Sequence, residues 1–196
     1  MLNDKKTPLE LPKLILASGS PRRSEIMNSV GWEFYKDVPD IDESELSGES
    51  PNDYVLRLAA SKAEVIAERH PGEIVLGADT TVVIDGRIIG KPDDSEHARE
   101  MIKMLSGSWH EVLTGVAVVR NGSASAAVER TRVKFAAMNE SEIEFLVEHG
   151  DPLDKAGGYA VQAQAALFIE GIEGDYWNVV GLPIGLVYRL VSNITK

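Results

Sequence analysis

Cysteine is absent from the 196-residue sequence, and its absence excludes several kinds of chemistry. The chain has no disulfide, no thiolate metal site and no cysteine nucleophile, so a metal ion must be held by carboxylates, histidines or the phosphates of a substrate. Histidines are few, and no pair has the spacing typical of a zinc site: His70, His97, His110 and His149. A zinc hydrolase is therefore disfavoured.

Basic residues are outnumbered by acidic ones, 20 to 31, which gives a net charge of −11. An extended nucleic-acid-binding face needs clustered positive charge, so the composition argues against a nucleic-acid partner, although a small anion can still bind at a local cationic pocket. The N-terminus lacks the apolar core of a signal peptide, and no apolar run approaches the ~20 residues that span a bilayer. We therefore expect a cytoplasmic protein with no membrane partner.

The remaining composition, 43% hydrophobic and 26% charged, fits one globular domain with room for two lobes. Hydrophobic periodicity and turn residues predict strands at 14–17, 74–84, 87–89, 112–119, 128–135 and, as one or two strands, 159–172. They predict helices at 21–30, 51–70, 94–105, 140–148 and 183–191. Strands alternate with helices early and form hairpins in the middle, so we expect an α/β fold with a mixed, twisted sheet and flanking helices.

The turn after the first strand reads Ser18-Gly19-Ser20-Pro21-Arg22-Arg23. Pro21 fits the first position of a helix, which places Arg22 and Arg23 where the helix dipole disfavours cations by about 0.3–1 kcal/mol. A bound anion resolves this conflict, and backbone N–H groups beside two guanidinium groups predict a phosphate site. An isolated motif of this kind is equally typical of a solvated arginine pair.

Lys62 interrupts the apolar face of the second helix. Val55, Leu58, Lys62, Val65 and Ile66 recur at spacings of three or four, so the Lys62 ammonium should point inward. Lysines on such faces usually extend to water, and that alternative stays open. If the helix lines a cleft, Lys62 can meet phosphate oxygens.

Asp79 interrupts an otherwise apolar strand. Desolvation penalises its charge there, and a metal ion or a cationic partner would compensate. As a site residue Asp79 can bind a hard cation or act as a base that orients water. The alternative is a structural carboxylate at a bulge, for which Gly77 provides the flexibility.

Two further charges are candidates by their position. Lys91, in Gly90-Lys91-Pro92, offers a cation, although the segment is not a P-loop because the spaced upstream glycine and the following serine or threonine are missing. Glu43 lies in an acidic loop that can supply a magnesium ligand, while most acidic runs are only solvated. Neither residue identifies a site by itself.

Taken together, the segments resemble the Maf-like family of nucleotide pyrophosphatases over almost the whole chain, from Leu14 to Val191. The matching motifs, in order, are LASGSPRR at 16–23, LGADT at 76–80, GKP at 90–92, LSGSWHEVLT at 105–114, DKAGGYAVQ at 154–162 and VVGLP at 179–183. Residues 1–13 then form an N-terminal extension, and residues 14–196 form a single Maf-like domain.

The resemblance implies a fold similar to that of the inosine triphosphate pyrophosphatases, with two lobes around a cleft, in a homodimer. It implies a nucleoside triphosphate diphosphatase that hydrolyses a small-molecule nucleoside triphosphate to the monophosphate and pyrophosphate with a divalent cation, Mg²⁺ or Mn²⁺. By matching positions, Asp79 is the proton acceptor, Lys62 and Lys91 are its catalytic partners, and Glu43 and Asp79 hold the metal. Phosphate binding falls to Ser18, Gly19, Ser20, Arg22 and Arg23.

The resemblance also implies that Arg22, Thr80 and Gln162 determine substrate choice. This set is similar to that of the family branch that acts on dTTP and UTP, and modified pyrimidine nucleotides are further candidate substrates. A glutamine amide can donate to a pyrimidine carbonyl and accept from N3–H, an edge that uracil and thymine share and cytosine lacks. Ala160 and Ala163 replace glycines expected beside Gln162, and their methyl groups reshape the base pocket.

Two rival functions remain from the sequence. One is the same reaction on 7-methylguanosine triphosphate or another noncanonical nucleotide. The other is a regulatory protein, linked to septum formation, that senses a nucleotide without hydrolysing it. The combination of Asp79, Lys62 and Lys91 favours catalysis.

Overall fold

A seven-stranded mixed sheet forms the centre of the computed structural model, which describes residues 11–195. The strand order is β2-β1-β3-β5-β6-β7, with β4 paired to β3. The strands are β1 (Leu14–Ala17), β2 (Phe34–Asp37), β3 (Val75–Ile84), β4 (Arg87–Ile89), β5 (Trp109–Arg120), β6 (Ser123–Phe135) and β7 (Ile169–Glu173). β1 pairs in parallel with β2 and β3, and the remaining pairs are antiparallel, as the sequence predicts for a mixed sheet.

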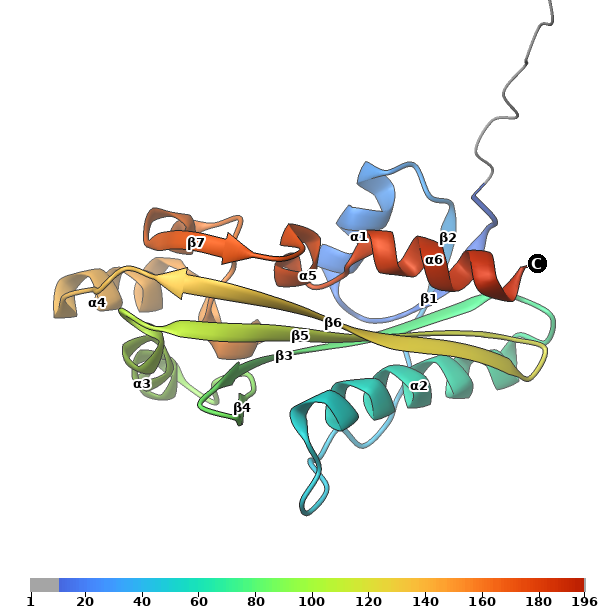
Figure 1. The fold of residues 1–196 in the computed structure, drawn as a ribbon, viewed down its shortest axis with the longest axis horizontal. Helices are drawn as coiled ribbons and strands as arrows, with labels where there is room; N and C mark the ends of the chain where they lie inside the picture. Colours follow the sequence, from blue (N-terminus) through green and yellow to red (C-terminus); the bar gives the residue numbers. More distant parts are fainter. Residues whose placement is uncertain (1–10, 196) are drawn as a thin grey trace, which may run out of the picture.

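Helices flank both faces of the sheet (Figure 1). They are α1 (Pro21–Ser29), α2 (Pro51–Arg69), α3 (Ser95–Leu105), α4 (Glu140–His149), α5 (Tyr176–Val180) and α6 (Ile184–Ile194), together with the 3-10 turns η1 (Pro152–Asp154), η2 (Ala156–Gly158) and η3 (Gln164–Leu167). Ser50, Asp94 and Asn139 cap α2, α3 and α4 by accepting hydrogen bonds from first-turn N–H groups. Within residues 11–195, no helix has the length and hydrophobicity needed to cross a membrane.

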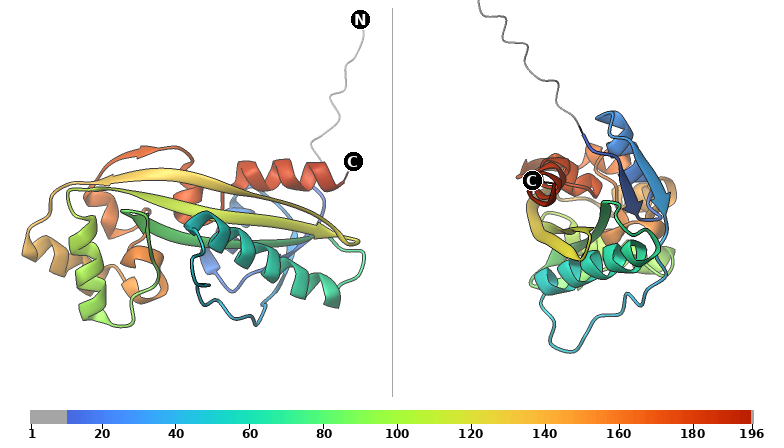
Figure 2. Two further views of the ribbon diagram at one scale, coloured as in Figure 1. Left: turned by 60° about the horizontal axis from the view of Figure 1, so that its bottom comes forward. Right: turned by 90° about the vertical axis from the view of Figure 1, so that its right-hand side faces the viewer.

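The long strands β3, β5 and β6 connect two lobes (Figures 1 and 2). In one lobe α2 covers one face of the sheet while α1 and α6 cover the other. The second lobe contains α3, α4, the 3-10 turns and β7 at the opposite end of the strands. The expectation of an α/β fold with two lobes is therefore confirmed.

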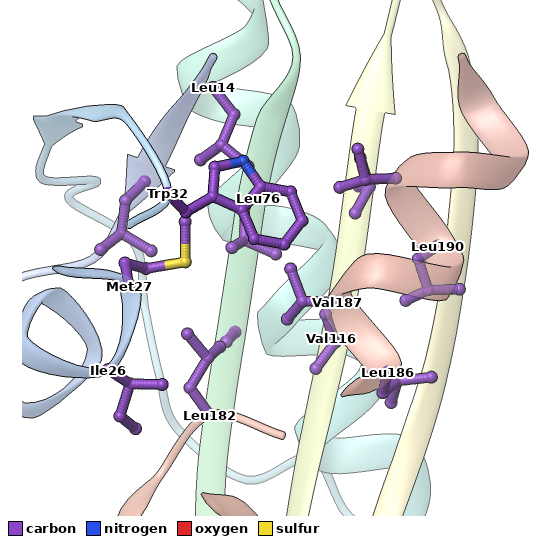
Figure 3. Close-up of a cluster of buried hydrophobic side chains, with 14 of the residues drawn as sticks. Leu14, Ile26, Met27, Trp32, Leu76, Val116, Leu182, Leu186, Val187 and Leu190 are labelled. Atoms are coloured by element: carbon purple, nitrogen blue, oxygen red, sulfur yellow. The ribbon is translucent and has the colours of Figure 1, made fainter. Parts of the chain in front are cut away.

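Each lobe has its own hydrophobic core. Figure 3 shows the larger cluster, in which side chains of α1 and α6 meet the sheet around Trp32 and Leu76. A second cluster packs α2 on the opposite face, and a third fills the other lobe around Phe135. Burial of these apolar side chains fixes both lobes to the same rigid sheet, so residues at their junction are held in place.

Two expectations from the sequence need correction, and two elements were missed. The strand predicted over residues 159–172 is present only as β7, because N–H groups of residues 163, 166 and 168 bond to carbonyls three residues earlier instead of to a neighbouring strand. β2 and α5 were not predicted. The alternative of a bulge at Asp79 is wrong, since β3 and β5 pair without a register shift from Val75 to Val83. The predicted N-terminal extension lies mostly outside the described residues.

Candidate active site

A cleft of about 540 Å³ lies at the junction of the two lobes. Its lining contains every site residue that the sequence singles out: Ser18, Gly19, Ser20, Arg22, Arg23, Glu43, Lys62, Asp79, Thr80, Lys91 and Gln162. These residues come from the β1–α1 turn, the β2–α2 loop, α2, β3 and the segments after β4 and η2. The fold thus assembles residues more than a hundred positions apart, while the role of each remains a prediction.

The β1–α1 turn presents the amino end of α1 to this cleft. Ser20 is the N-cap residue of α1, but its side chain makes no capping hydrogen bond, in contrast to the caps of α2, α3 and α4. The Ser20 N–H donates to Ser18 Oγ at 3.2 Å, which keeps the turn tight. A helix start without a side-chain cap leaves first-turn N–H groups for an anion.

Arg23 is buried behind the turn and braces it. Its Nε donates to Gly181 O (2.9 Å), its Nη1 to Ser18 Oγ (3.1 Å) and Ala78 O (2.8 Å), and its Nη2 to Thr80 Oγ1 (3.0 Å). Four of the five guanidinium N–H directions are therefore used within the protein. Arg23 contributes positive charge to the cleft and ties the turn to β3, but it has little donor capacity left for a ligand.

Arg22 instead reaches across the cleft to the other lobe. Its Nη1 donates to Asp154 Oδ2 at 3.1 Å and its Nη2 to Asp154 O at 3.2 Å. Lys155, which is buried, donates to the same carboxylate and to Asp151. Burial acts to raise the pKa of Asp154, but the hydrogen bond from Lys155 and the charge of Arg22 outweigh it and hold that pKa below the usual value. Asp154 thus remains an anion that joins two cations at the cleft.

Lys62 joins two carboxylates of the cleft, Asp79 and Glu43. Lys62 Nζ lies 2.7 Å from Asp79 Oδ1 and 2.7 Å from Glu43 Oε1. The Lys62 and Asp79 side chains are only 9% and 11% exposed. The inward orientation of Lys62 is confirmed, and the partner that compensates for burying Asp79 is this ammonium. Burial nevertheless raises the pKa of Asp79, against the opposing effects of Lys62 and Arg23.

Two glycines explain why α2 lies close enough for this contact. A Cβ atom at Gly77 would lie 2.2 Å from Ala59 O, and one at Gly115 would lie 2.1 Å from Val55 O. Gly115 pairs directly with Asp79 in the β3–β5 ladder. Gly77 therefore serves close helix–sheet packing, which brings Lys62 over the strand that carries Asp79.

Thr80 and Gln162 also line the cleft. Thr80 Oγ1 lies 2.9 Å from Thr114 Oγ1 and accepts from Arg23, so its hydroxyl is fixed in direction. Gln162 is exposed in the cleft lining beside Ala160, whereas Ala163 and Gln164 are not part of that lining. Of the two amides, Gln162 is the one placed to meet a ligand.

Tyr54, Asp154 and Lys155 also line the cleft and were not assigned a role from the sequence. Tyr54 lies two helical turns before Lys62 on the same face of α2, a spacing that already pointed toward the site. Burial, together with the charges of Asp79 and Glu43, raises the pKa of Tyr54 to about 12, so its hydroxyl stays protonated. Asp154 and Lys155 stand in the DKAGGY segment, and no local pattern sets them apart from a surface charge pair.

The donor set fits a divalent cation shared with a substrate. Lys62 contacts one oxygen of each carboxylate, Asp79 Oδ1 and Glu43 Oε1, which leaves Oδ2 and Oε2 as hard oxygen donors. Within residues 11–195, no three or more acidic or histidine side chains are grouped as a complete metal site. Phosphate oxygens would have to complete the coordination.

The chain matches the family model of Maf-like proteins over residues 13–194. It is 48% identical over 186 residues to a dTTP/UTP pyrophosphatase of Symbiobacterium thermophilum, covering 95% of this chain and 94% of that one. A dTTP/UTP pyrophosphatase of Anaeromyxobacter dehalogenans is 49% identical, with 88% and 89% covered. The solved structure of the Staphylococcus aureus Ham1 protein shares the fold, with a TM-score of 0.53 at 13% identity over 93% and 99% of the chains.

Proposed function

The chain belongs to the Maf-like protein family, and from this premise we propose that it hydrolyses dTTP and UTP to the nucleoside monophosphate and pyrophosphate. The observation that carries the proposal is the buried Lys62–Asp79 pair in a cleft that also contains an uncapped helix start. The relatives named dTTP/UTP pyrophosphatases cover nearly the whole chain, which supports the same substrates here.

We propose that Asp79 is the proton acceptor of the reaction. A water molecule beside its carboxylate attacks the α-phosphorus, and Asp79 takes the proton as the new P–O bond forms. The bond between the α-phosphorus and its bridging oxygen breaks, and pyrophosphate leaves with that oxygen. Lys62, 2.7 Å from Asp79, holds the carboxylate in place and adds positive charge beside the reacting phosphate.

The β1–α1 turn binds the phosphate chain in this proposal. Gly19 offers its N–H, Ser18 and Ser20 offer their hydroxyls, and Arg22 keeps three guanidinium N–H groups beyond the two that are bonded to Asp154. Arg23 acts mainly by its charge and by holding the turn, because four of its N–H groups are already used. Lys91, which is exposed on the rim, approaches the departing pyrophosphate.

A divalent cation, Mg²⁺ or Mn²⁺, completes the proposed site. Glu43 and Asp79 would hold it together with phosphate oxygens. When bound, it neutralises charge that develops on the phosphates. Lys62 bridges the two carboxylates, since its ammonium contacts one oxygen of each.

Base selection follows from Gln162. Its amide matches the carbonyl and N3–H edge of uracil and thymine, and Thr80 and Arg22 fix the neighbouring wall of the cleft. Ala160 belongs to the cleft lining and Ala163 does not, so of the two alanines Ala160 is the one that affects the base pocket in this proposal.

A pyrophosphate-release screen tests the proposed function. Purified protein is assayed with canonical, methylated and deaminated triphosphates, each with Mg²⁺ and with Mn²⁺. We expect dTTP and UTP to rank first and CTP to rank low. Faster turnover of 7-methylguanosine triphosphate than of dTTP and UTP would show that the protein prefers that substrate. Tight nucleotide binding with no product in a single turnover would support the nucleotide sensor instead.

The remaining expectations are the homodimer, the cytoplasmic location and the single domain over residues 14–196. We propose the homodimer and the single domain from the resemblance to the family, and the cytoplasmic location from the composition of the sequence. Light scattering of the purified protein gives the oligomeric state, and twice the monomer mass is the expected result. Removal of residues 1–10, which retains the hydrogen bond from Trp32 Nε1 to Pro12 O, should leave the activity unchanged.

A further inference from the structure

Glu43 lies in a loop, residues 38–50, that has no helix or strand to hold it. Its side chain is 53% exposed, yet its carboxylate lies 2.7 Å from Lys62 inside the cleft. An exposed loop loses much conformational entropy when it is fixed in one position. Contacts elsewhere in the loop must therefore keep Glu43 at the cleft.

A bidentate ion pair between Arg57 of α2 and Glu49 holds the C-terminal end of this loop. Arg57 Nε donates to Glu49 Oε1 at 2.6 Å, and Arg57 Nη2 donates to Glu49 Oε2 at 2.7 Å. The Glu49 side chain is only 8% exposed, and its Oε2 also accepts from the Leu46 N–H at 3.2 Å. The bidentate geometry fixes direction as well as distance, unlike a single contact between exposed charges.

The same helix also binds the loop backbone at Glu43 itself. Tyr54 Oη donates to Glu43 O at 3.1 Å, and Arg57 Nη2 donates to Ser44 O at 3.0 Å. Tyr54 and Arg57 are three positions apart and therefore neighbours on the surface of α2. Two side chains of one helix thus hold two consecutive carbonyls, one of them that of Glu43.

α2 is a rigid base for these contacts, because Gly77 and Gly115 let it pack directly on the sheet. It carries Tyr54, Arg57 and Lys62, so one helix fixes both the loop backbone and the ammonium that faces the Glu43 carboxylate. α2 therefore positions both the loop backbone and the contact between Lys62 and Glu43.

We propose that Arg57 and Glu49 are positioning residues that clamp the 38–50 loop and hold Glu43 at the cleft, with Tyr54 as the second attachment. Neither Arg57 nor Glu49 lines the cleft, so the clamp acts through Glu43. This inference rests on the proposed function, in which Glu43 binds the cation that accompanies the nucleotide.

Hydrogen exchange without metal or nucleotide tests the clamp independently of activity. Arg57→Gln removes the bidentate ion pair with Glu49. We expect faster exchange in the 38–50 loop and unchanged exchange in the rest of the chain. Arg69→Gln is the matched control, because Arg69 stands on the same helix and pairs with Asp37 of β2 rather than with this loop. Unchanged loop exchange in Arg57→Gln would overturn the clamp.

Kinetics test whether the clamp acts through Glu43. We expect Arg57→Gln to lower kcat/KM for dTTP by about 10- to 100-fold and to raise the half-saturating Mg²⁺ concentration, whereas Arg69→Gln changes neither. Arg57→Lys keeps the positive charge but not the bidentate geometry, so its kcat/KM should lie between those of wild type and Arg57→Gln. The double variant Glu43→Gln/Arg57→Gln should be no slower than Glu43→Gln alone, within about twofold.

Three results are distinguishable. Additive losses in the double variant would overturn the positioning role, since Arg57 would then act without Glu43. Wild-type protein that releases no pyrophosphate from any triphosphate would overturn the proposed function and, with it, the positioning role. Faster loop exchange together with non-additive losses supports the inference.

Discussion

Individual residues of the cleft differ most in the number of hydrogen bonds and ion pairs that they make within the protein. Arg23 and Thr80 are tied into the fold, whereas Lys91 and Gln162 are exposed in the cleft. Lys62 lies between these extremes, since it is buried and paired with two carboxylates. Substitution of an exposed cleft residue should therefore lower activity alone, whereas substitution of a buried one should lower stability as well.

The two lysines provide the first comparison. Lys91→Met should lower kcat/KM for dTTP by about 10-fold or more while the free energy of unfolding changes by less than about 0.5 kcal/mol, because the side chain is exposed. Lys62→Met should lower activity and also stability by about 1–3 kcal/mol, since Asp79 loses its buried partner. Denaturant unfolding and initial rates measure both. Normal kinetics in both variants would make Lys62 a structural residue and Lys91 a surface residue.

The two glutamines provide a matched pair for base selection. Gln162→Leu should lower kcat/KM for dTTP and UTP by about 10- to 100-fold relative to CTP, because the imide edge loses its hydrogen-bonding partner. Gln164→Leu should leave the ranking unchanged, since Gln164 lies outside the cleft lining. An equal loss for all three nucleotides in Gln162→Leu would remove Gln162 from base selection.

At the level of the helices and strands, close packing of α2 on β3 and β5 brings the site together. Gly77→Ala would place a methyl group 2.2 Å from Ala59 O, so α2 must shift and take Lys62 with it. We expect about 1–3 kcal/mol of destabilisation and a loss of turnover. Gly185→Ala, in α6, meets only Arg189 at 3.7 Å and should stabilise by about 0.5–1 kcal/mol without changing turnover. Unaltered kinetics in Gly77→Ala would contradict this account of α2.

The longer elements could be predicted from the sequence because their caps, turns and hydrophobic periodicity agree. Ser50 and Pro51 start α2, and Asp85-Gly86 turns β3 into β4. β2 was missed because it has four residues, of which two are exposed, and it obtains its order from pairing with β1. α5 was missed because four of its five residues are aromatic or β-branched and favour a strand locally.

The site was predictable where a charge conflicted with its local environment. Asp79 in an apolar strand and Lys62 on an apolar helix face each signal a partner. The sequence does not indicate that each is the partner of the other, because that depends on how closely α2 packs on the sheet. Arg57 and Asp154 show no such conflict, and only the folded arrangement brings them to the cleft or its loop.

Across the whole molecule, stability should fall in mild acid because of His110. Burial lowers the pKa of His110 from 6.5 to about 4. The unfolded chain therefore binds more protons between these values, and the stabilisation present above pH 6.5 decreases as the pH drops toward 4. The full effect is about 3 kcal/mol.

Unfolding free energies at several pH values test this contribution. His110→Gln should have a shallower pH dependence than wild type in this window, whereas His149→Gln, at an exposed position, should retain the wild-type slope. Identical slopes for wild type and His110→Gln would show that His110 does not contribute.

The most direct test of the central claim is pyrophosphate release from dTTP by Asp79→Asn, measured with Mg²⁺ against wild type and Asp85→Asn. Asparagine suits the hairpin turn at residue 85, so this control removes one carboxylate without disturbing the fold. We predict a loss of about 10²- to 10⁴-fold in Asp79→Asn and wild-type turnover in Asp85→Asn. A folded Asp79→Asn protein that releases pyrophosphate at the wild-type rate would contradict the account.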